Sequence, residues 1–271
     1  MQNFKMPVRE QNSHKGTFGK VLNFSGCKNY IGAAYLSTKS SLKVGAGLSA
    51  LASEKQIISS VSAMLPEAIY LTRKEGLDKI NEFSVVLIGC GLGQGIEAKK
   101  HLKKVLKKTK NKPLIIDADG LNLLATITPS QPSPSREGVI ITPHPLEASR
   151  LLGCPVEQVI ENLEDSAKKL SKKYNCVTVL KTHRTIICDK DLNIYINQHG
   201  NSALAKAGSG DVLAGIIAGL LAQGTQAFEA SKLGVYLHSR SGEIASKKLT
   251  EYSVLANDLI DYIPEAIAEI I

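Results

Sequence analysis

Short apolar runs alternate with amphipathic segments along most of the chain. The apolar runs predict buried strands, and the amphipathic segments repeat with the spacing of helices. Strands are expected at 21–24, 48–51, 85–88, 114–116, 139–141, 177–180, 185–188 and 193–196. Helices are expected at 30–43, in the lysine-rich segment after 93, at 147–152, at 156–173 and through most of the chain from 211 onward.

This alternation predicts an α/β fold in which right-handed crossover units build a mostly parallel sheet with helices on both faces. A single domain over 1–271 is expected, and the Ser- and Pro-rich segment 129–138 is interpreted as a surface loop. Residues suited to chemistry follow the strands. They are Gly91, Asp117, Asp119, His144 and Lys181. Ligands of such sheets bind beyond the carboxyl ends of the strands, so one active edge is expected.

Composition narrows the class of protein. The 271 residues include 43% hydrophobic and 21% charged residues, which is ordinary for a globular protein. The net charge of +8 favours polyanionic ligands. Much of it lies on one expected helix, at Lys99, Lys100, Lys103, Lys104, Lys107, Lys108, Lys110 and Lys112. We interpret these lysines as a solvated face, because no aromatic or base-reading pattern accompanies them, and nucleic acid is not an expected partner.

Targeting and cysteine patterns point to the cytoplasm. The five cysteines are odd in number and form no C-x-x-C pair, so neither a disulfide framework nor a zinc site is expected. Residues 1–10 are polar and lack the apolar core of a signal peptide. The strongly apolar stretch at 212–222 is too short to cross a bilayer, and no membrane association is expected.

The most informative segment is a glycine-rich turn at the start of an apolar helix. Gly208, Ser209, Gly210 and Asp211 lie there. The first N–H groups of a helix lack partners and attract anions, and glycines let a phosphate approach the backbone. Asp211 could then take a proton from an attacking hydroxyl, as phosphoryl transfer to an alcohol requires. The alternative is that Ser209 or Asp211 only caps the helix.

Three further clusters are each only weak evidence for a ligand site. The glycines of 89–93 follow a strand and suit either a tight turn or close approach of a ligand. His144 could bind a ligand and Glu147 could help to hold a metal, or the two could simply satisfy a loop and a helix start. The expected hairpin at 181–185 is cationic, which suits phosphates but also suits a solvated turn.

Taken together, the motifs resemble those of the ADP- or ATP-dependent NAD(P)H-hydrate dehydratases, which have the ribokinase-like fold. The motifs occur in the family's order from His14 to about Pro264. They are His14-Lys15-Gly16 with Gly19, Gly32-Ala33-Ala34, Val44-Gly45-Ala46-Gly47, Gly91-Leu92-Gly93, Asp117-Ala118-Asp119-Gly120-Leu121-Asn122, Thr142-Pro143-His144-Pro145-Leu146-Glu147 and Gly208-Ser209-Gly210-Asp211. The related hydroxyethylthiazole kinases typically carry cysteine where this chain has Asp211.

The resemblance implies a repair reaction in which hydrated NADH or NADPH is phosphorylated and then loses phosphate, with ADP or ATP as co-substrate and Mg²⁺ as cofactor. It places Ala33, Gly91, His144 and Asp211 on the hydrated cofactor. It places Lys181, Thr182, His183, Arg184, Thr185 and Gly210 on the nucleotide. Asp211 would act with the backbone of Gly208 and Gly210 in catalysis. The metal ligands stay open, with Glu147 as an indirect candidate.

The chain departs from the family pattern at Cys90, where proline is usual, and at Thr182 and Ala207, where glycine is frequent. The last two make the choice between ADP and ATP open. Because the motifs begin at His14, no N-terminal epimerase domain is expected, and a separate NAD(P)H-hydrate epimerase would act in the same pathway. Homo-oligomer formation is left open. The alternatives are a small-molecule kinase of the same fold and a catalytically silent nucleotide sensor.

Overall fold

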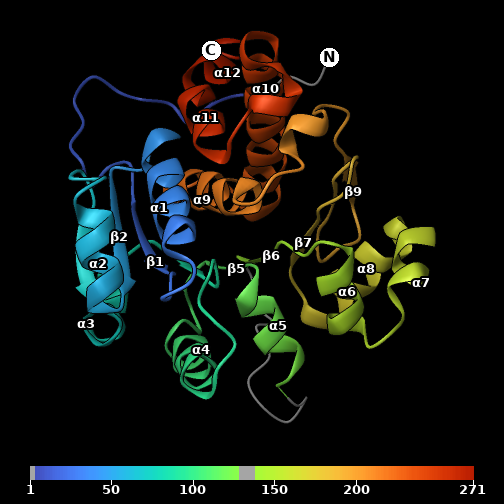
Figure 1. Cartoon of the computed structure of the whole chain (residues 1–271), viewed down its shortest axis with the longest axis horizontal. Helices are drawn as coiled ribbons and strands as arrows, with labels where there is room; N and C mark the ends of the chain where they lie inside the picture. The colour runs from blue at the N-terminus through green and yellow to red at the C-terminus, as the bar shows by residue number, and fades with distance from the viewer. Residues whose placement is uncertain (1–3, 128–137) are drawn as a thin grey trace.

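The computed structural model describes residues 4–127 and 138–271, and within them nine strands form one sheet (Figure 1). The spatial order is β3-β2-β1-β4-β5-β6-β7-β8-β9. The strands are β1 Lys20–Phe24, β2 Leu48–Ser53, β3 Ile69–Thr72, β4 Val85–Ile88, β5 Leu114–Ile116, β6 Val139–Ile141, β7 Val177–Leu180, β8 Ile186–Cys188 and β9 Ile194–Ile196. Pairings from β3 through β7 are parallel, whereas β8 and β9 pair antiparallel. The mostly parallel sheet is confirmed.

Helices cover both faces of this sheet. They are α1 Ile31–Lys43, α2 Lys55–Ser62, α3 Arg73–Asp78, α4 Ile96–Lys108, α5 Asp119–Ala125, α6 Pro145–Leu152, α7 Val156–Glu161, α8 Leu163–Tyr174, α9 Ser209–Ala222, α10 Ala227–Ser253, α11 Ala256–Asp261 and α12 Ile263–Ala268, with short 3₁₀ turns at Ile80–Glu82 and Ser202–Leu204. Figure 1 shows α9 to α12 on one side of the sheet and α4 to α8 on the other.

The strands bury both faces because their apolar runs are continuous. In β4, Val85 and Leu87 join the core beneath α9 and α10, while Val86 and Ile88 join the core beneath α4. Successive side chains of a strand point to opposite faces, so an uninterrupted apolar run fills two cores at once. This explains why the sequence predicted the central strands well.

The elements that the sequence did not predict are short or lie at an edge. Strand β3 forms the edge of the sheet, and Ile69 is 42% exposed, so no apolar run marks it. The helix expected at 156–173 is two helices, because Asn162 adopts a non-helical backbone with φ −134° and ψ 57°. The segment expected to be a surface loop, 129–138, lies outside the described residues except for Gly138.

The lysine-rich segment forms α4 as far as Lys108, and Lys110 and Lys112 follow the end of the helix. Leu102, Val105 and Leu106 are buried on one side, and most of the lysines lie on the exposed side. Among the described helices, none combines the length and the apolar character that crossing a membrane requires.

Close packing of α9 on α1 places the start of α9 at the carboxyl edge of the sheet. A side-chain carbon on Gly215 would lie 2.3 Å from the carbonyl oxygen of Ser37, and one on Gly219 would lie 2.5 Å from that of Ser41. Only glycine permits this approach. The strand order also reverses between β1 and β4, and such a switch point opens a crevice for ligands.

Candidate functional site

The candidate site lies where the loops after β4, β5, β6 and β7 meet the first turn of α9. These loops carry Cys90, Asp117, His144 and Lys181 in that order. Parallel strands bring their carboxyl ends to a common edge, so residues far apart in sequence meet there. The expectation of one active edge therefore agrees with where the structure brings these residues together.

The first turn of α9 is open to an anion. Gly208 is the residue before the helix and has φ +90°, a left-handed conformation that favours glycine. No side chain in the described part of the chain caps this helix. The hydroxyl of Ser209 lies instead 3.0 Å from Nε2 of the buried His238, whose ring nitrogen also lies 3.0 Å from the Ser209 carbonyl oxygen. The interpretation that Ser209 or Asp211 serves only as a cap is therefore wrong.

Asp211 is partly buried beside two other potential proton-transfer groups. One carboxylate oxygen of Asp211, one of Asp117 and the sulfur of Cys90 all lie within 4.8 Å of one another. Burial and the negative charge of Asp117 raise the pKa of Asp211 to about 7, against the weaker opposing effects of Cys90 and Lys181. A carboxylate with this pKa can both hold and release a proton near neutral pH.

Asp117 is almost completely buried and is held by several groups. Its Oδ1 accepts hydrogen bonds from Lys181 Nζ at 2.7 Å and from the Thr142 hydroxyl at 2.6 Å. The Cys90 thiol lies 3.7 Å from its Oδ2. The next residue, Ala118, has φ +47°, which turns the chain between Asp117 and the start of α5. A strained backbone at this point is typical of a functional loop.

Lys181 points inward from the end of β7. Its ammonium lies 2.7 Å from Asp117 Oδ1 and 3.9 Å from Glu147 Oε2. Burial alone would lower the pKa of Lys181, but the charges of Asp117 and Glu147 raise it to about 12, so it stays protonated.

A cavity of about 680 Å³ adjoins this cluster. It lies between the β7–β8 hairpin, the start of α9 and the middle of α10. It is lined by His144, Lys181, Thr182, His183, Thr185, Asn197, His199, Gly200, Asn201, Ser202, Leu204, Ala205, Lys206, Ser209, Gly210, Leu213, Val235, His238 and Ser239. The residues expected on the nucleotide line this cavity, with the exception of Arg184, whose side chain is exposed on the hairpin.

His144 and Glu147 have a structural role at the start of α6. Nδ1 of His144 accepts from the N–H groups of Leu146 and Glu147, and Oε2 of Glu147 accepts from the His144 N–H at 2.9 Å. Burial and the nearby Lys181 lower the pKa of His144, and burial raises that of Glu147. The imidazole still lines the cavity, so capping the helix and facing a ligand are compatible.

Ala33 and Gly91 lie together at the switch point between β1 and β4. Gly91 has φ +59°, and a side-chain carbon there would lie 2.9 Å from Cβ of Ala33 and 2.5 Å from Cβ of Tyr30. The first turn of α1 and the loop after β4 therefore touch. Neither residue is among those that line the 680 Å³ cavity, so the residues expected on the hydrated cofactor divide between two places.

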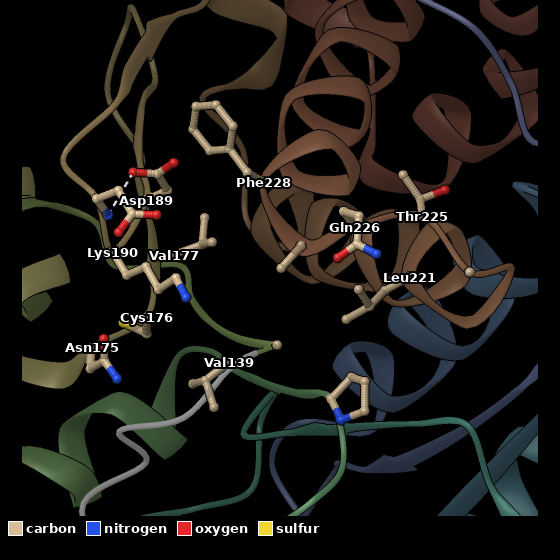
Figure 2. Close-up of a pocket in the computed structure, with 15 residues that line it drawn as sticks. Val139, Asn175, Cys176, Val177, Asp189, Lys190, Leu221, Thr225, Gln226 and Phe228 are labelled. Atoms are coloured by element: carbon tan, nitrogen blue, oxygen red, sulfur yellow. Dashed lines mark hydrogen bonds between the residues drawn. The ribbon is translucent and has the colours of Figure 1, made fainter.

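A second cavity, of about 490 Å³, lies at the opposite, amino edge of the sheet. Figure 2 shows Val139, Val177, Leu221 and Phe228 around it. At its rim, Asp189 stabilises a local turn, because its Oδ1 accepts hydrogen bonds from the N–H groups of Asp191 and Asn193. No buried charged cluster like that around Asp117 lines this cavity among the residues that the structure describes.

Sequence reasoning did not single out two residues of this arrangement, Thr142 and His238, and it noted Asp117 as suited to chemistry without giving it a role. Thr142 stood in a motif that was noted, and its position directly after a strand was the available signal. His238 lies in the middle of α10, and no local pattern distinguishes it.

A family model described as NAD(P)H-hydrate dehydratase matches residues 21–265 of the chain. The chain is 38% identical over 239 residues to the ADP-dependent (S)-NAD(P)H-hydrate dehydratase of Neisseria meningitidis serogroup B, and the match covers 88% of this chain and 80% of that protein. The chain also matches bifunctional NAD(P)H-hydrate repair enzymes, but it spans only about half of their length.

Two solved structures are similar over nearly the whole chain. One is the ADP/ATP-dependent NAD(P)H-hydrate dehydratase from Bacillus subtilis co-crystallized with ATP/Mg²⁺, with a TM-score of 0.87, 31% identity and coverage of 98% of this chain and 95% of that one. The other is a ribokinase-like superfamily protein from Enterococcus faecalis V583, with a TM-score of 0.87, 33% identity and coverage of 98% and 92%. The ribokinase-like fold is confirmed.

Proposed function

The chain belongs to the NAD(P)H-hydrate dehydratase family, and we propose that it dehydrates hydrated NADH or NADPH with Asp211 as the base that starts the reaction. In the first step, Asp211 takes the proton of the ring hydroxyl, and the hydroxyl oxygen attacks the terminal phosphorus of the nucleotide. In the second step, the C–O bond breaks and phosphate leaves with the bonding electrons, while a proton is lost from the neighbouring ring carbon. The products are NADH or NADPH, phosphate and AMP from ADP, or ADP from ATP.

The single observation that carries this mechanism is the position of Asp211. Its carboxylate is partly buried, has a pKa raised to about 7, and follows a helix start that no side chain caps within the described chain. The N–H groups of Gly210 and Asp211 belong to the first turn of α9, where no intrahelical acceptor precedes them. An anion site and a base one residue apart suit phosphoryl transfer to an alcohol.

The remaining residues divide between the two substrates. Lys181, Thr182, His183, Thr185 and Gly210 line one cavity, which supports a role on the nucleotide. Arg184 belongs to the same hairpin and would act at its exposed rim.

Ala33 and Gly91 lie at the switch-point crevice, which supports a role on the hydrated cofactor together with Asp211. His144 lines the nucleotide cavity, so we place it where the two substrates would meet. Gly208 acts through its backbone, since its positive φ starts the anion turn.

Magnesium would enter mainly through the nucleotide. The one group of three or more potential ligand side chains in the described residues contains Cys90, and a thiol does not suit Mg²⁺. Glu147 is the carboxylate beside the cavity that fits. Both of its oxygens have contacts, Oε2 with the His144 N–H at 2.9 Å and Oε1 with His144 Nε2 at 3.4 Å, so an indirect role through water suits it. When bound, Mg²⁺ would neutralise phosphate charge.

The relatives named as ADP-dependent favour ADP over ATP as the phosphoryl donor. Kinases of the fold are similar at only 14–18% identity, which shows the fold alone, and family membership favours the dehydratase over a kinase or a silent sensor.

A separate epimerase would supply the correct epimer of the substrate. A cytoplasmic location, a single-domain organisation and homo-oligomer formation stay predictions of the sequence.

The test is to incubate the purified protein with hydrated NADH, Mg²⁺ and either ADP or ATP while recording the absorbance of restored NADH. The expected result is NADH and phosphate in equal amounts with ADP. A stable phosphorylated product without restored NADH would instead indicate a kinase, and tight nucleotide binding without turnover would indicate a sensor. Parallel assays with hydrated NADPH would establish the cofactor preference.

A further inference from the structure

Lys181 lies at the boundary between the two halves of the site. A side-chain carbon on Gly210 would lie 3.4 Å from Lys181 Nζ, so the ammonium is directly against the first turn of α9. The same side chain lines the 680 Å³ cavity. On its other side is Asp117, whose carboxylate belongs to the group that contains Asp211. The ammonium is thus between the base and the nucleotide cavity.

We propose that Asp117 is a positioning residue that holds the Lys181 ammonium at the phosphoryl group in flight from the nucleotide to the hydroxyl. This proposal rests on the proposed function and deepens it. Lys181 then acts on the transferred group itself and contributes little to holding the nucleotide before transfer.

The geometry fixes the ammonium without help from a ligand. A lysine ammonium is a point charge on a flexible stem and would otherwise follow any nearby phosphate. Here Asp117 Oδ1 accepts from Lys181 at 2.7 Å, and the Thr142 hydroxyl holds the same oxygen at 2.6 Å. Asp117 is 1% exposed, so water does not compete for these contacts. A charge that is already in place needs no reorganisation during transfer.

Stability alone does not explain this pair. Burying two charges is costly, and replacing a buried ion pair with apolar residues is often neutral or stabilising. Four strand ends and the start of α9 meet around the pair. Retaining a buried pair at the edge where both substrates would meet indicates a role in the reaction.

Asp117 also acts on the base. Four charged or titratable groups act on Asp211: Cys90 from the loop after β4, Asp117 from the loop after β5, Asp119 from the start of α5, and Lys181 from the end of β7. Of these charges, that of Asp117 contributes most to raising the pKa of Asp211. Removing it should therefore move the pH profile, which a purely structural role would not do.

The experiment compares Asp117→Asn, Lys181→Met and the double variant in the full-length enzyme. Removing a charge that stabilises a phosphoryl group should lower kcat by about 10²–10³-fold in Lys181→Met. Asp117→Asn should lose most of the same activity, and the double variant should be no worse than Lys181→Met, because groups that act as a unit are not additive. The double variant should also regain thermal stability, since neither charge is left unpaired.

Three readouts separate this role from simple nucleotide binding. The affinity for ADP alone, measured by calorimetry, should change by less than about threefold, because contacts made only in the transition state do not affect ground-state binding. With ADP as the donor, the leaving nucleotide is AMP, so AMP with aluminium fluoride mimics the phosphoryl group in flight. The tight binding of this mimic should be lost in both single variants. The acidic limb of the rate profile should shift to lower pH by roughly half a unit or more in Asp117→Asn.

A matched control is the pair Asp165 and Lys169 on α8, which has the same 2.7 Å separation but is exposed. Asp165→Asn and Lys169→Met should change none of these readouts. The proposal is overturned if Asp117→Asn keeps near-native kcat, if the losses of the two single variants multiply, or if binding of ADP alone falls as much as kcat. If the unmodified enzyme binds AMP with aluminium fluoride through this pair but does not restore NADH, the proposed function fails and the role of Asp117 remains.

Discussion

The two ends of α9 lie against two cavities of similar size and quite different chemistry. The helix begins at Ser209 beside the cavity of about 680 Å³ and ends at Ala222 beside the cavity of about 490 Å³. At its start lie a buried ion pair, a carboxylate with a raised pKa and an uncapped helix turn. At its end, Leu221 and Phe228 form apolar walls, and Asp189 at the rim accepts hydrogen bonds within its own turn (Figure 2).

This difference teaches that the volume of a cavity does not identify a site. The carboxyl edge is distinguished by buried ionisable side chains, Asp117, Lys181 and Asp211, which shift one another's pKa values. Fixed charges are costly unless they are paired, so their presence at one edge indicates selection for chemistry there. At the amino edge, the same sheet and the same helix enclose a cavity with apolar walls, as expected where side chains are selected for packing and not for chemistry.

The largest expected effect that tests the comparison is at Asp211. Asp211→Asn keeps the size of the side chain but removes the base, so turnover should fall by about 10²–10⁴-fold. Nucleotide affinity should change little, because the N–H groups of the helix start remain. Steady-state assays of NADH restoration and calorimetry with ADP would measure both, and near-native turnover would refute the mechanism.

At the other end of the helix, Leu221→Ala should affect stability and not chemistry. Leu221 is 7% exposed, and truncating a buried leucine costs about 2–5 kcal/mol, with the lower end expected beside an existing cavity. Denaturant unfolding would measure the loss. The kcat of the folded enzyme should stay unchanged, and a drop in kcat at constant KM would show that the two ends are coupled.

The pH dependence gives the next effect. The proposed base Asp211 acts only when ionised, and its pKa is raised to about 7, so kcat/KM should fall about tenfold for each pH unit below 7. The folded state also holds a proton between the ordinary value of 3.8 and about 7 that the unfolded state has lost, so the free energy of unfolding should fall as pH rises through this window.

Asp211→Asn removes that dependence and supplies the control. The variant should be more stable than the unmodified protein at pH 8, and the two should converge below about pH 4. Thermal unfolding at both values would check this. Equal differences at pH 4 and pH 8 would show that the carboxylate is not held in a costly environment.

The smallest expected effect is at His238, which supports the anion turn from α10. His238→Leu removes the ring nitrogen that lies 3.0 Å from both the hydroxyl and the carbonyl of Ser209, so kcat should fall by about three- to tenfold, the value of one hydrogen bond. His238→Gln places an N–H donor in a similar position and should recover most of this loss. If neither variant changes kcat, the turn keeps its shape without this support.

Much of the fold followed from local sequence. Apolar runs such as 85–88 and 139–141 indicated strands buried on both faces, and glycines at 208 and 210 indicated a helix start that an anion could approach. The sequence could predict these features because an apolar run and a glycine-rich helix start each depend on residues that are close together in the chain. The short helix α5 and the edge strand β3 were missed because neither has a continuous apolar pattern.

The sequence by itself determined the order of the strands along the chain, the residues that end them and the carboxylate that follows the glycine turn. Only the tertiary structure decided that Lys181 turns inward to Asp117, that His144 lines the 680 Å³ cavity while Ala33 and Gly91 meet elsewhere, and that His238 contacts Ser209. The physical reason is that these contacts join residues from 29 to 64 positions apart. Such pairs are set by which strands are neighbours and by how closely α9 packs on the sheet, and no local pattern records either.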